Sequence, residues 1–173
     1  MWIIRNIVIS LLCVAGLFSI IASGGPKYVY RSNQVTGTDI DGRVSVSMQA
    51  LCYGSCKAYL LTIVNNTDKD IELDWNKTLY ISSGKTSGGF MFEGVLYKDR
   101  NNRKPPDIIF PGQEFSKKIY PNNLINYTSG KYGGWVHYPI PAGENGAYVT
   151  LRIGEDEINK RLIVNITRKK VTN

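Results

Sequence analysis

Residues 44–64 read VSVSMQALCYGSCKAYLLTIV, and their alternation indicates the fold class of the chain. Apolar side chains stand at every second position of residues 44–52, which is the period of a half-buried β-strand. After residues 53–55, a second alternating run covers residues 56–64. The pattern predicts two antiparallel strands joined by a tight hairpin.

The two cysteines of this segment predict a disulfide across the hairpin. On one extended strand, Cys52 and Cys56 would lie about 13 Å apart, whereas the Cα atoms of a disulfide are usually about 4.4–6.8 Å apart. The bridge therefore requires the hairpin, and the predicted pairs are 52 with 56, 50 with 58, 48 with 60, 46 with 62 and 44 with 64. A redox or metal-binding pair is the alternative, although Cys-x₃-Cys lacks the two-residue spacing of thioredoxin-like motifs.

A further strand is expected on the C-terminal side of this hairpin, where residues 70–76 alternate strictly. The alternation places Trp75 on the buried face and Asp70, Glu72 and Asp74 on the other. Alternate side chains of a strand are about 6.6–7 Å apart, but Ca²⁺ gathers oxygen atoms at about 2.3–2.6 Å. We therefore interpret the acidic face as solvated and expect neither a metal site nor another cofactor.

The same signals extend over most of the chain. Further strands are expected at residues 77–82, 90–98, 107–110, 114–120 and 135–140, and in a final hairpin of residues 147–153 and 162–166. About eight to ten short strands with frequent turns are typical of an antiparallel two-sheet β-sandwich. We expect one all-β domain at residues 37–168, with an N-terminal lead-in at 25–36 and a basic C-terminal tail at 169–173.

Part of this domain resembles a known kind of fold. Residues 44–48 (VSVSM) and 61–75 (LTIVNNTDKDIELDW) look like the strand, Asn-containing turn and strand of Ig-like β-sandwiches in bacterial envelope proteins. That group includes the N-terminal domain of periplasmic pilus chaperones. The resemblance covers roughly residues 44–75 and implies a single Ig-like sandwich. Those chaperones have two domains and a longer chain, so it implies no activity and no binding residue.

The first 24 residues differ in composition from the rest. Arg5 is their only charged side chain, and an apolar run covers residues 7–22 before the small residues Ser23 and Gly24. These features are typical of a secretory signal peptide that is cleaved after Gly24. The run is slightly long for a signal and slightly short for a bilayer span, so an uncleaved membrane-anchor helix at residues 1–24 is the alternative.

Export bears on the cysteines, the charge and the location of the protein. An exported chain meets a compartment that oxidises thiols, which favours the predicted disulfide. The 173-residue chain carries a net charge of +7, and loss of residues 1–24 removes one arginine and no acid. We expect a periplasmic or secreted protein, or one anchored in the membrane only through residues 1–24 with its domain outside the cytoplasm.

The basic residues gather in two segments, which contain Lys98, Arg100, Arg103 and Lys104, and Arg168, Lys169 and Lys170. Both segments are candidates for contact with an anionic partner such as an envelope polymer or lipid head groups. Nucleic acid is not expected as a partner, because its recognition needs a basic face interleaved with aromatic residues, and export separates the chain from it.

Residues 120–138 are rich in aromatic side chains set among glycines. The candidate binding residues there are Tyr127, Tyr132, Trp135, His137 and Tyr138. Flat amphipathic rings on glycine-set loops provide contact area for sugars or protein partners at low entropic cost. An aromatic hairpin that closes one end of the core is the alternative interpretation.

Catalytic motifs are scarce in this sequence. His137 is the single histidine and the only candidate for a neutral-pH base. No Gly-x-Ser-x-Gly elbow, phosphate-binding glycine loop or metal-ligand spacing accompanies it in the sequence. We therefore predict an exported, non-catalytic binding or structural module of the cell envelope, with an envelope protein or polysaccharide as partner. The alternatives are a membrane-tethered assembly or chaperone-like factor and a small envelope hydrolase that uses His137.

Overall fold

The structure, a computed structural model, describes residues 28–38 and 42–171. Within these residues the regular structure is β-strand, apart from two 3₁₀ turns at Tyr97–Asp99 (η1) and Asn122–Leu124 (η2). The prediction of an all-β protein with antiparallel sheets is confirmed. The expected signal or anchor helix at residues 1–24 lies outside the described residues. In the described part, no helix has the length and apolar character that crossing a membrane requires.

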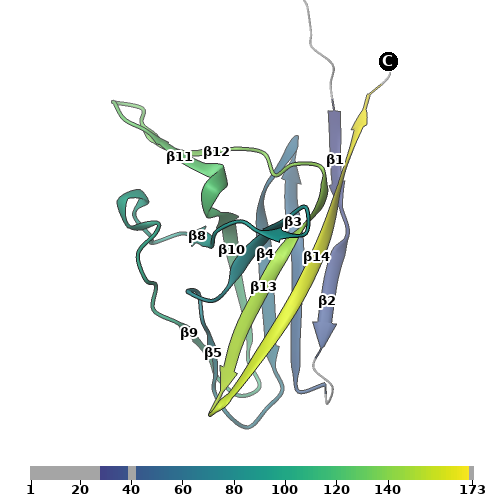
Figure 1. The fold of residues 1–173 in the computed structure, drawn as a ribbon, viewed down its shortest axis with the longest axis vertical. Helices are drawn as coiled ribbons and strands as arrows, with labels where there is room; N and C mark the ends of the chain where they lie inside the picture. The colour runs from purple at the N-terminus through teal and green to yellow at the C-terminus, as the bar shows by residue number, and fades with distance from the viewer. Residues whose placement is uncertain (1–27, 39–41, 172–173) are drawn as a thin grey trace, which may run out of the picture.

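The larger of the two main sheets has seven strands (Figure 1). They are β1 (Tyr28–Ser32), β5 (Ile71–Leu73), β6 (Leu79–Ser82), β7 (Lys85–Thr86), β9 (Asp107–Ile109), β13 (Gly143–Ile153) and β14 (Asp156–Lys170). The main path is β1-β14-β13-β5-β9, and β6 pairs with β13 and with β7. The β13–β14 hairpin, which the alternation of residues 147–153 and 162–166 predicts, lies at the centre of this sheet.

The second sheet has five strands in the order β2-β3-β4-β10-β8. Their bounds are β2 (Gln34–Thr38), β3 (Val44–Tyr53), β4 (Ser55–Asn65), β8 (Phe90–Phe92) and β10 (Glu114–Pro121). A separate two-stranded ribbon is formed by β11 (Ile125–Thr128) and β12 (Gly134–His137). Figure 1 shows this ribbon projecting from one end of the two sheets, at the upper left.

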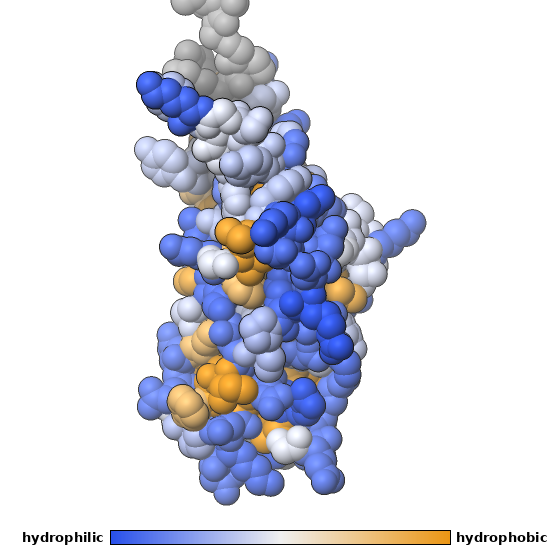
Figure 2. All heavy atoms as spheres, turned by 90° about the vertical axis from the view of Figure 1, so that its left-hand side faces the viewer, coloured by the Kyte–Doolittle hydropathy of each residue, from blue (hydrophilic) through white to orange (hydrophobic). Residues whose placement is uncertain are grey.

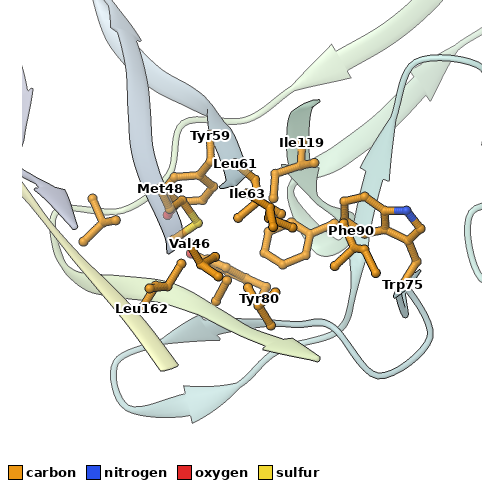
Figure 3. Packing of buried hydrophobic residues seen from close by; sticks show 14 of the residues in the cluster. Val46, Met48, Tyr59, Leu61, Ile63, Trp75, Tyr80, Phe90, Ile119 and Leu162 are labelled. Atoms are coloured by element: carbon orange, nitrogen blue, oxygen red, sulfur yellow. The ribbon is translucent and has the colours of Figure 1, made fainter. Parts of the chain in front are cut away.

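Both sheets bury their inner faces in one hydrophobic core. Figure 3 shows side chains from the two sheets converging there, among them Val46, Met48, Tyr59, Leu61, Ile63, Phe90, Ile119, Tyr80 and Leu162. Trp75 is buried as predicted, and its ring centroid lies 4.6 Å from that of Phe92. Two antiparallel sheets over a shared core fit the β-sandwich that the strand pattern predicts.

The β3–β4 hairpin has the predicted cysteine pair but a different register beyond it. Cys52 pairs with Cys56, whereas Leu51 pairs with Ala58, which leaves Lys57 as an extra residue of β4. Such a bulge slips the register by one residue and exchanges the two faces of the strand. The predicted pairs from 50–58 to 44–64 are therefore wrong. The core side of β4 carries Tyr59, Leu61 and Ile63 instead of Leu60, Thr62 and Val64.

The two ends of the described chain correct the predicted domain limits. The region predicted as a lead-in, residues 25–36, contains β1, which pairs with β14, and most of β2, which pairs with β3. The predicted basic tail begins as strand, since Lys169 and Lys170 pair with Val29 and Tyr28. These are edge positions with many polar residues, so the hydrophobic alternation that marks buried strands is weak there.

Other boundaries also differ from the predicted ones, and the structure has fourteen strands where about eight to ten were expected. The strand expected at residues 90–98 ends at Phe92, and Gly94 follows in a turn with φ of 92°. The strand expected at residues 135–140 ends at His137, two residues before Pro139. The ribbon strand β11 had no counterpart among the expected strands.

Candidate functional site

The predicted disulfide between Cys52 and Cys56 is confirmed at the tip of the β3–β4 hairpin, where the two Cα atoms lie 3.9 Å apart. The backbone N–H of Ile140 donates to the carbonyl oxygen of Cys56 at 2.8 Å. This bond ties the segment after β12 to the hairpin. The aromatic ribbon and the disulfide, which are about 80 residues apart in sequence, therefore meet at one end of the molecule.

An open hollow of about 460 Å³ lies beside the disulfide. We call it the hairpin hollow, and its lining residues are Leu51, Cys52, Tyr53, Ser55, Lys57, Ala58, Lys118, Tyr120 and His137. Its volume falls within the range of about 300–1,000 Å³ that is typical of small-ligand sites. Of the predicted binding residues, His137 lines it directly.

Local backbone structure brings the polar side chains of the hollow together. Lys57 is the extra residue of the β4 bulge, and bulges re-aim side chains in this way. Lys118 and Tyr120 flank Ile119, which is buried in the core, so both point to the outer face of the five-stranded sheet. His137 is the last residue of β12 and is half-buried.

Three aromatic rings pack at the edge of the hollow. The ring centroids of Tyr120 and His137 are 4.3 Å apart, and the two planes are inclined by 34°. Trp135 meets Tyr120 edge to face, with centroids 6.4 Å apart, and lies 5.9 Å from His137. Part of the predicted aromatic surface thus packs on the outer face of the five-stranded sheet and not on the core between the sheets.

The electrostatics of the hollow are cationic. Partial burial lowers the pKa of His137, and the nearby positive charges of Lys118 and Lys57 lower it further. The buried Nδ1 atom of His137 has no hydrogen-bond partner among the described residues. A buried N–H without an acceptor is costly, so we expect the neutral ring to carry its proton on Nε2. The residues lining the hollow include no Asp or Glu.

A second hollow of about 240 Å³ is lined by Glu93, Gly94, Tyr120 and Trp135. Because Tyr120 lines both hollows, they adjoin at this residue. This second hollow carries one carboxylate, in contrast to the first. Both hollows also border the ribbon, through His137 and Trp135 of β12.

Another contact joins the predicted aromatic surface to one basic segment. Tyr127 stacks on Tyr97, with ring centroids 5.8 Å apart. The guanidinium of Arg100 lies 4.2 Å from the centre of the Tyr97 ring, and the Tyr97 hydroxyl donates to Oδ1 of Asn126 at 3.1 Å. Tyr97, which the sequence did not single out, therefore links Tyr127 with Arg100.

The remaining predicted aromatic residues lie outside the hairpin hollow. Tyr132 is 91% exposed, and its nearest charged neighbour is Lys131, 5.6 Å from the ring centre. Tyr138 is 47% exposed, and its backbone N–H donates to the carbonyl oxygen of Leu124. The structure thus divides the predicted aromatic surface into a packed part and an exposed part.

The other predicted basic residues do not line the hairpin hollow. Lys98 and Arg103 are exposed, whereas Lys104 donates to the carbonyl oxygen of Arg100 at 2.8 Å, and burial lowers its pKa. In the C-terminal segment, the guanidinium of Arg168 lies 4.5 Å from the centre of the Tyr28 ring. Lys169 and Lys170 border a separate hollow of about 250 Å³.

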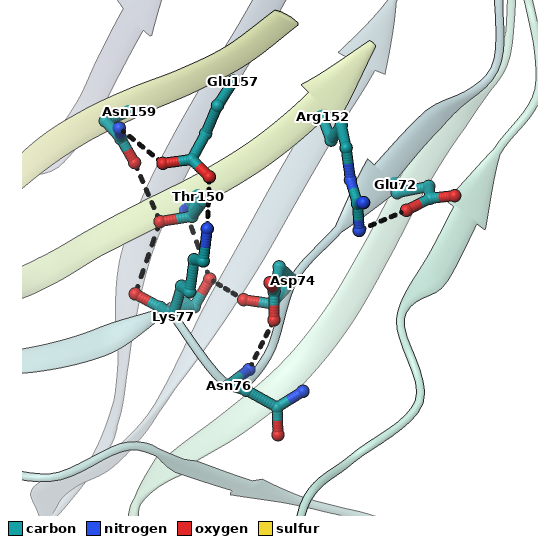
Figure 4. Close-up of polar contacts among 9 residues, drawn as sticks. Glu72, Asp74, Asn76, Lys77, Thr150, Arg152, Glu157 and Asn159 are labelled. Atoms are coloured by element: carbon teal, nitrogen blue, oxygen red, sulfur yellow. Dashed lines mark hydrogen bonds and ion pairs between the residues drawn. The ribbon is translucent and has the colours of Figure 1, made fainter. Parts of the chain in front are cut away.

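The acidic face that the sequence predicted as solvated makes local polar contacts (Figure 4). Glu72 forms an ion pair with Arg152 at 2.8 Å, and Oδ1 of Asp74 accepts the backbone N–H of Asn76 at 2.9 Å. Among residues 28–38 and 42–171, no three His, Cys, Asp or Glu side chains are grouped so that they could hold a metal ion.

Seven residues that line the hollow were not identified as site residues from the sequence, namely Leu51, Tyr53, Ser55, Lys57, Ala58, Lys118 and Tyr120. The aromatic signal included Tyr120, but the positions of the two lysines depend on the bulge and on the pairing of β10 with β4. Apolar patches on the side of the molecule shown in Figure 2 are separated by hydrophilic areas.

No family model matches the chain, and no curated protein matches it. One solved structure, described as the X-ray structure of Northeast Structural Genomics Consortium target SoR45, aligns with 82% of this chain and 84% of its own chain. The two are 13% identical in sequence, with a TM-score of 0.33. This similarity carries no information about the site, whose chemistry follows from its own residues.

Proposed function

We propose that this chain is an exported, non-catalytic binding module of the cell envelope, built as a single Ig-like sandwich. Its partner, an envelope protein or polysaccharide, docks at the hairpin hollow. The observation that carries the proposal is the convergence of Lys57, Lys118 and His137 beside the ring of Tyr120. Three separate elements supply these groups, and convergent polar groups in a concave surface are the usual mark of a binding site.

Export is supported by the disulfide together with the N-terminal sequence. Disulfides persist in oxidising compartments, and the bridge closes a hairpin at the surface of the domain. The apolar segment of residues 7–22 precedes the first described strand, which starts at Tyr28. The mature domain is periplasmic or secreted and begins after Gly24.

Affinity capture from the native cell envelope tests the proposal. The immobilised protein is compared with a Lys57→Gln/Lys118→Gln variant and with a Lys69→Gln/Lys85→Gln control, which removes the same charge from exposed lysines elsewhere. We expect the wild type and the control to retain the same partner and the hollow variant to lose it. Equal retention by all three proteins would show that the partner binds elsewhere.

A membrane-tethered assembly or chaperone-like factor is a second candidate, favoured by the apolar N-terminal segment. Tyr28 at the start of β1 pairs with the basic end of β14, where Lys169 and Lys170 lie. A tether would thus enter the domain beside two positive charges, as suits an anionic membrane surface. The intact mass of the protein from its native host distinguishes the two: a chain that starts at Gly25 is processed, and one that keeps residues 1–24 is tethered.

A small hydrolase is the candidate from another class, because His137 and Ser55 both line a concave hollow. Nucleophilic catalysis requires a serine and a base within hydrogen-bond reach, with a third group that orients the base. Ester turnover by the wild type, Ser55→Ala and His137→Gln proteins tests this candidate. A non-catalytic module gives the same background rate in all three, whereas a hydrolase loses its activity in both variants.

A further inference from the structure

We infer that the hairpin hollow binds a carboxylated sugar unit of an acidic polysaccharide. The inference rests on the proposed function, because it names the ligand class of the same site. The carboxylate lies between the ammonium groups of Lys57 and Lys118, and the sugar ring packs near Tyr120. The adjoining hollow beside Trp135 takes the next sugar unit.

Unneutralised positive charge is the first support for an anionic ligand. The side chains of Lys57 and Lys118 are exposed, and neither forms a salt bridge with a described residue. Lys117, the residue before Lys118, faces the other side of β10 and is paired with Asp107. The hollow therefore presents two ammonium groups to solvent without a carboxylate in its lining, and a bound carboxylate would provide charge-assisted hydrogen-bond acceptors.

The surroundings of His137 support the same conclusion. Lys118 and Tyr120 of β10 and Lys57 of β4 line the hollow together with His137. The rings of Tyr120 and Trp135 lie 4.3 and 5.9 Å from the His137 ring. The two lysines lower the pKa of His137, and all three side chains line the same hollow. An anion placed among these groups would reverse the effect and raise that pKa.

The aromatic surface favours a sugar over a simple anion. A sugar ring has C–H groups on its faces and hydroxyls around its edge, which matches an aromatic ring surrounded by hydrogen-bond donors. Tyr120 lines both hollows, of about 460 and 240 Å³, so a ligand longer than one ring can extend past it. An inorganic anion or a lipid head group would use the charges but not this second hollow.

The second hollow also limits the sequence of sugar units. Its lining includes the exposed carboxylate of Glu93 and no basic residue. A second carboxylate would be repelled there, whereas a neutral sugar would pack on Trp135. The best fit is an acidic polysaccharide in which carboxylated and neutral sugars alternate.

The test uses a hyaluronan tetrasaccharide, in which glucuronate alternates with N-acetylglucosamine, and the neutral tetramer of N-acetylglucosamine. NMR follows the ring signals of His137, the single histidine of the chain, over a pH series with and without each sugar. We expect the acidic tetrasaccharide to bind and to raise the pKa of His137. Binding should weaken about tenfold in Lys57→Gln and in Lys118→Gln, as for loss of a charged hydrogen bond, and should not change in Lys85→Gln.

Three results would overturn the inference: no binding of the acidic tetrasaccharide, equal binding of the neutral one, or equal binding by the wild type and both hollow variants. The inference would also be overturned if the protein bound phosphatidylglycerol vesicles through Lys57 and Lys118 but did not bind the sugar. That result would assign the hollow to a membrane surface. If the sugar fails but envelope capture still depends on Lys57 and Lys118, the proposed function stands without this ligand.

Discussion

Lys57 shows how much of the site depends on a single residue. It is the extra residue in β4 opposite the Leu51–Cys52 step, and it lies in the hairpin hollow together with Lys118 and His137. Without that bulge, the apolar face of β4 would consist of other side chains, and the position of Lys57 on the sheet would change. The residue that breaks the strand pattern is therefore one that the proposed site needs.

His137 gives a residue-scale prediction about pH. Its pKa should lie below the ordinary value of about 6.5 and should rise when Lys118→Gln removes the larger of the two charge effects. Because the folded state binds the proton less well than the unfolded state, this group stabilises the fold fully above about pH 6.5. The contribution is lost as the pH falls from there through the folded pKa. NMR titration checks the pKa; an unchanged value in the variant would contradict the assigned cause.

Asn65 gives a second prediction at this scale. It is fully buried, its amide donates to the carbonyl oxygens of Lys69 and Ile109 at 2.8 Å, and its Oδ1 accepts the N–H of Thr67 at 2.9 Å. Asn65→Ala should lower the free energy of unfolding by about 3 kcal/mol, because buried polar groups lose their partners. Urea unfolding measures this loss. The exposed neighbour variant Asn66→Ala should stay within about 0.5 kcal/mol of the wild type.

The strands divide into those that the sequence predicts and those that it does not. β3, β4, β13 and β14 have strong alternation, and their hairpins are present as expected. β1, β2 and β7 lie at sheet edges and are short or largely polar. Because such strands bury few side chains, the alternation of apolar residues does not predict them. The bulge in β4 was missed because a disulfide fixes one pair of a hairpin but not the register beyond it.

The disulfide gives a prediction for the β3–β4 hairpin. It closes a short loop, since the cysteines are four residues apart, and the chain-entropy contribution of such a loop is about 2 kcal/mol at most. A Cys52→Ser/Cys56→Ser variant should therefore stay folded and lose up to that amount in urea unfolding. A variant that fails to fold would show that the bridge is needed to form the hairpin at all.

The β13–β14 hairpin gives a further prediction through Gly146. A Cβ atom at this position would overlap the carbonyl oxygen of Leu162 on the neighbouring strand, whereas one at Gly134 in β12 would meet nothing within 4 Å. Gly146→Ala should lower the unfolding free energy by about 3 kcal/mol, the upper end of the range for overpacking. Gly134→Ala is the matched control and should leave the unfolding midpoint unchanged. Equal midpoints for the two variants would contradict the close approach of the strands.

At the scale of the whole molecule, one end of the sandwich gathers the features of interest. The disulfide tip, the ribbon of β11 and β12, the start of β1 and the end of β14 lie at this end (Figure 1). Short loops and turns occupy the other end. The described chain therefore begins and ends at the same end of the sandwich as the proposed site.

The site could be predicted only in part from the sequence. The aromatic composition of residues 120–138 pointed to His137, which lines the hairpin hollow, and to Trp135, which lines the second hollow. The basic segments pointed to Arg100 and Lys104, which do not line the hairpin hollow. A run of charged residues along the chain does not indicate which charges lie close together in the folded protein. Lys57 and Lys118 belong to strands that pair in the fold, and that juxtaposition is a tertiary property.

The central claim is that the hairpin hollow is where the partner binds, and NMR mapping tests it most directly. Backbone amide spectra of the labelled protein are recorded with and without the partner retained from the envelope. We predict shifts concentrated at residues 51–58, 118–120 and 135–137, the segments around the hollow. Shifts confined to other surfaces, such as the paired ends of β1 and β14, would contradict the claim.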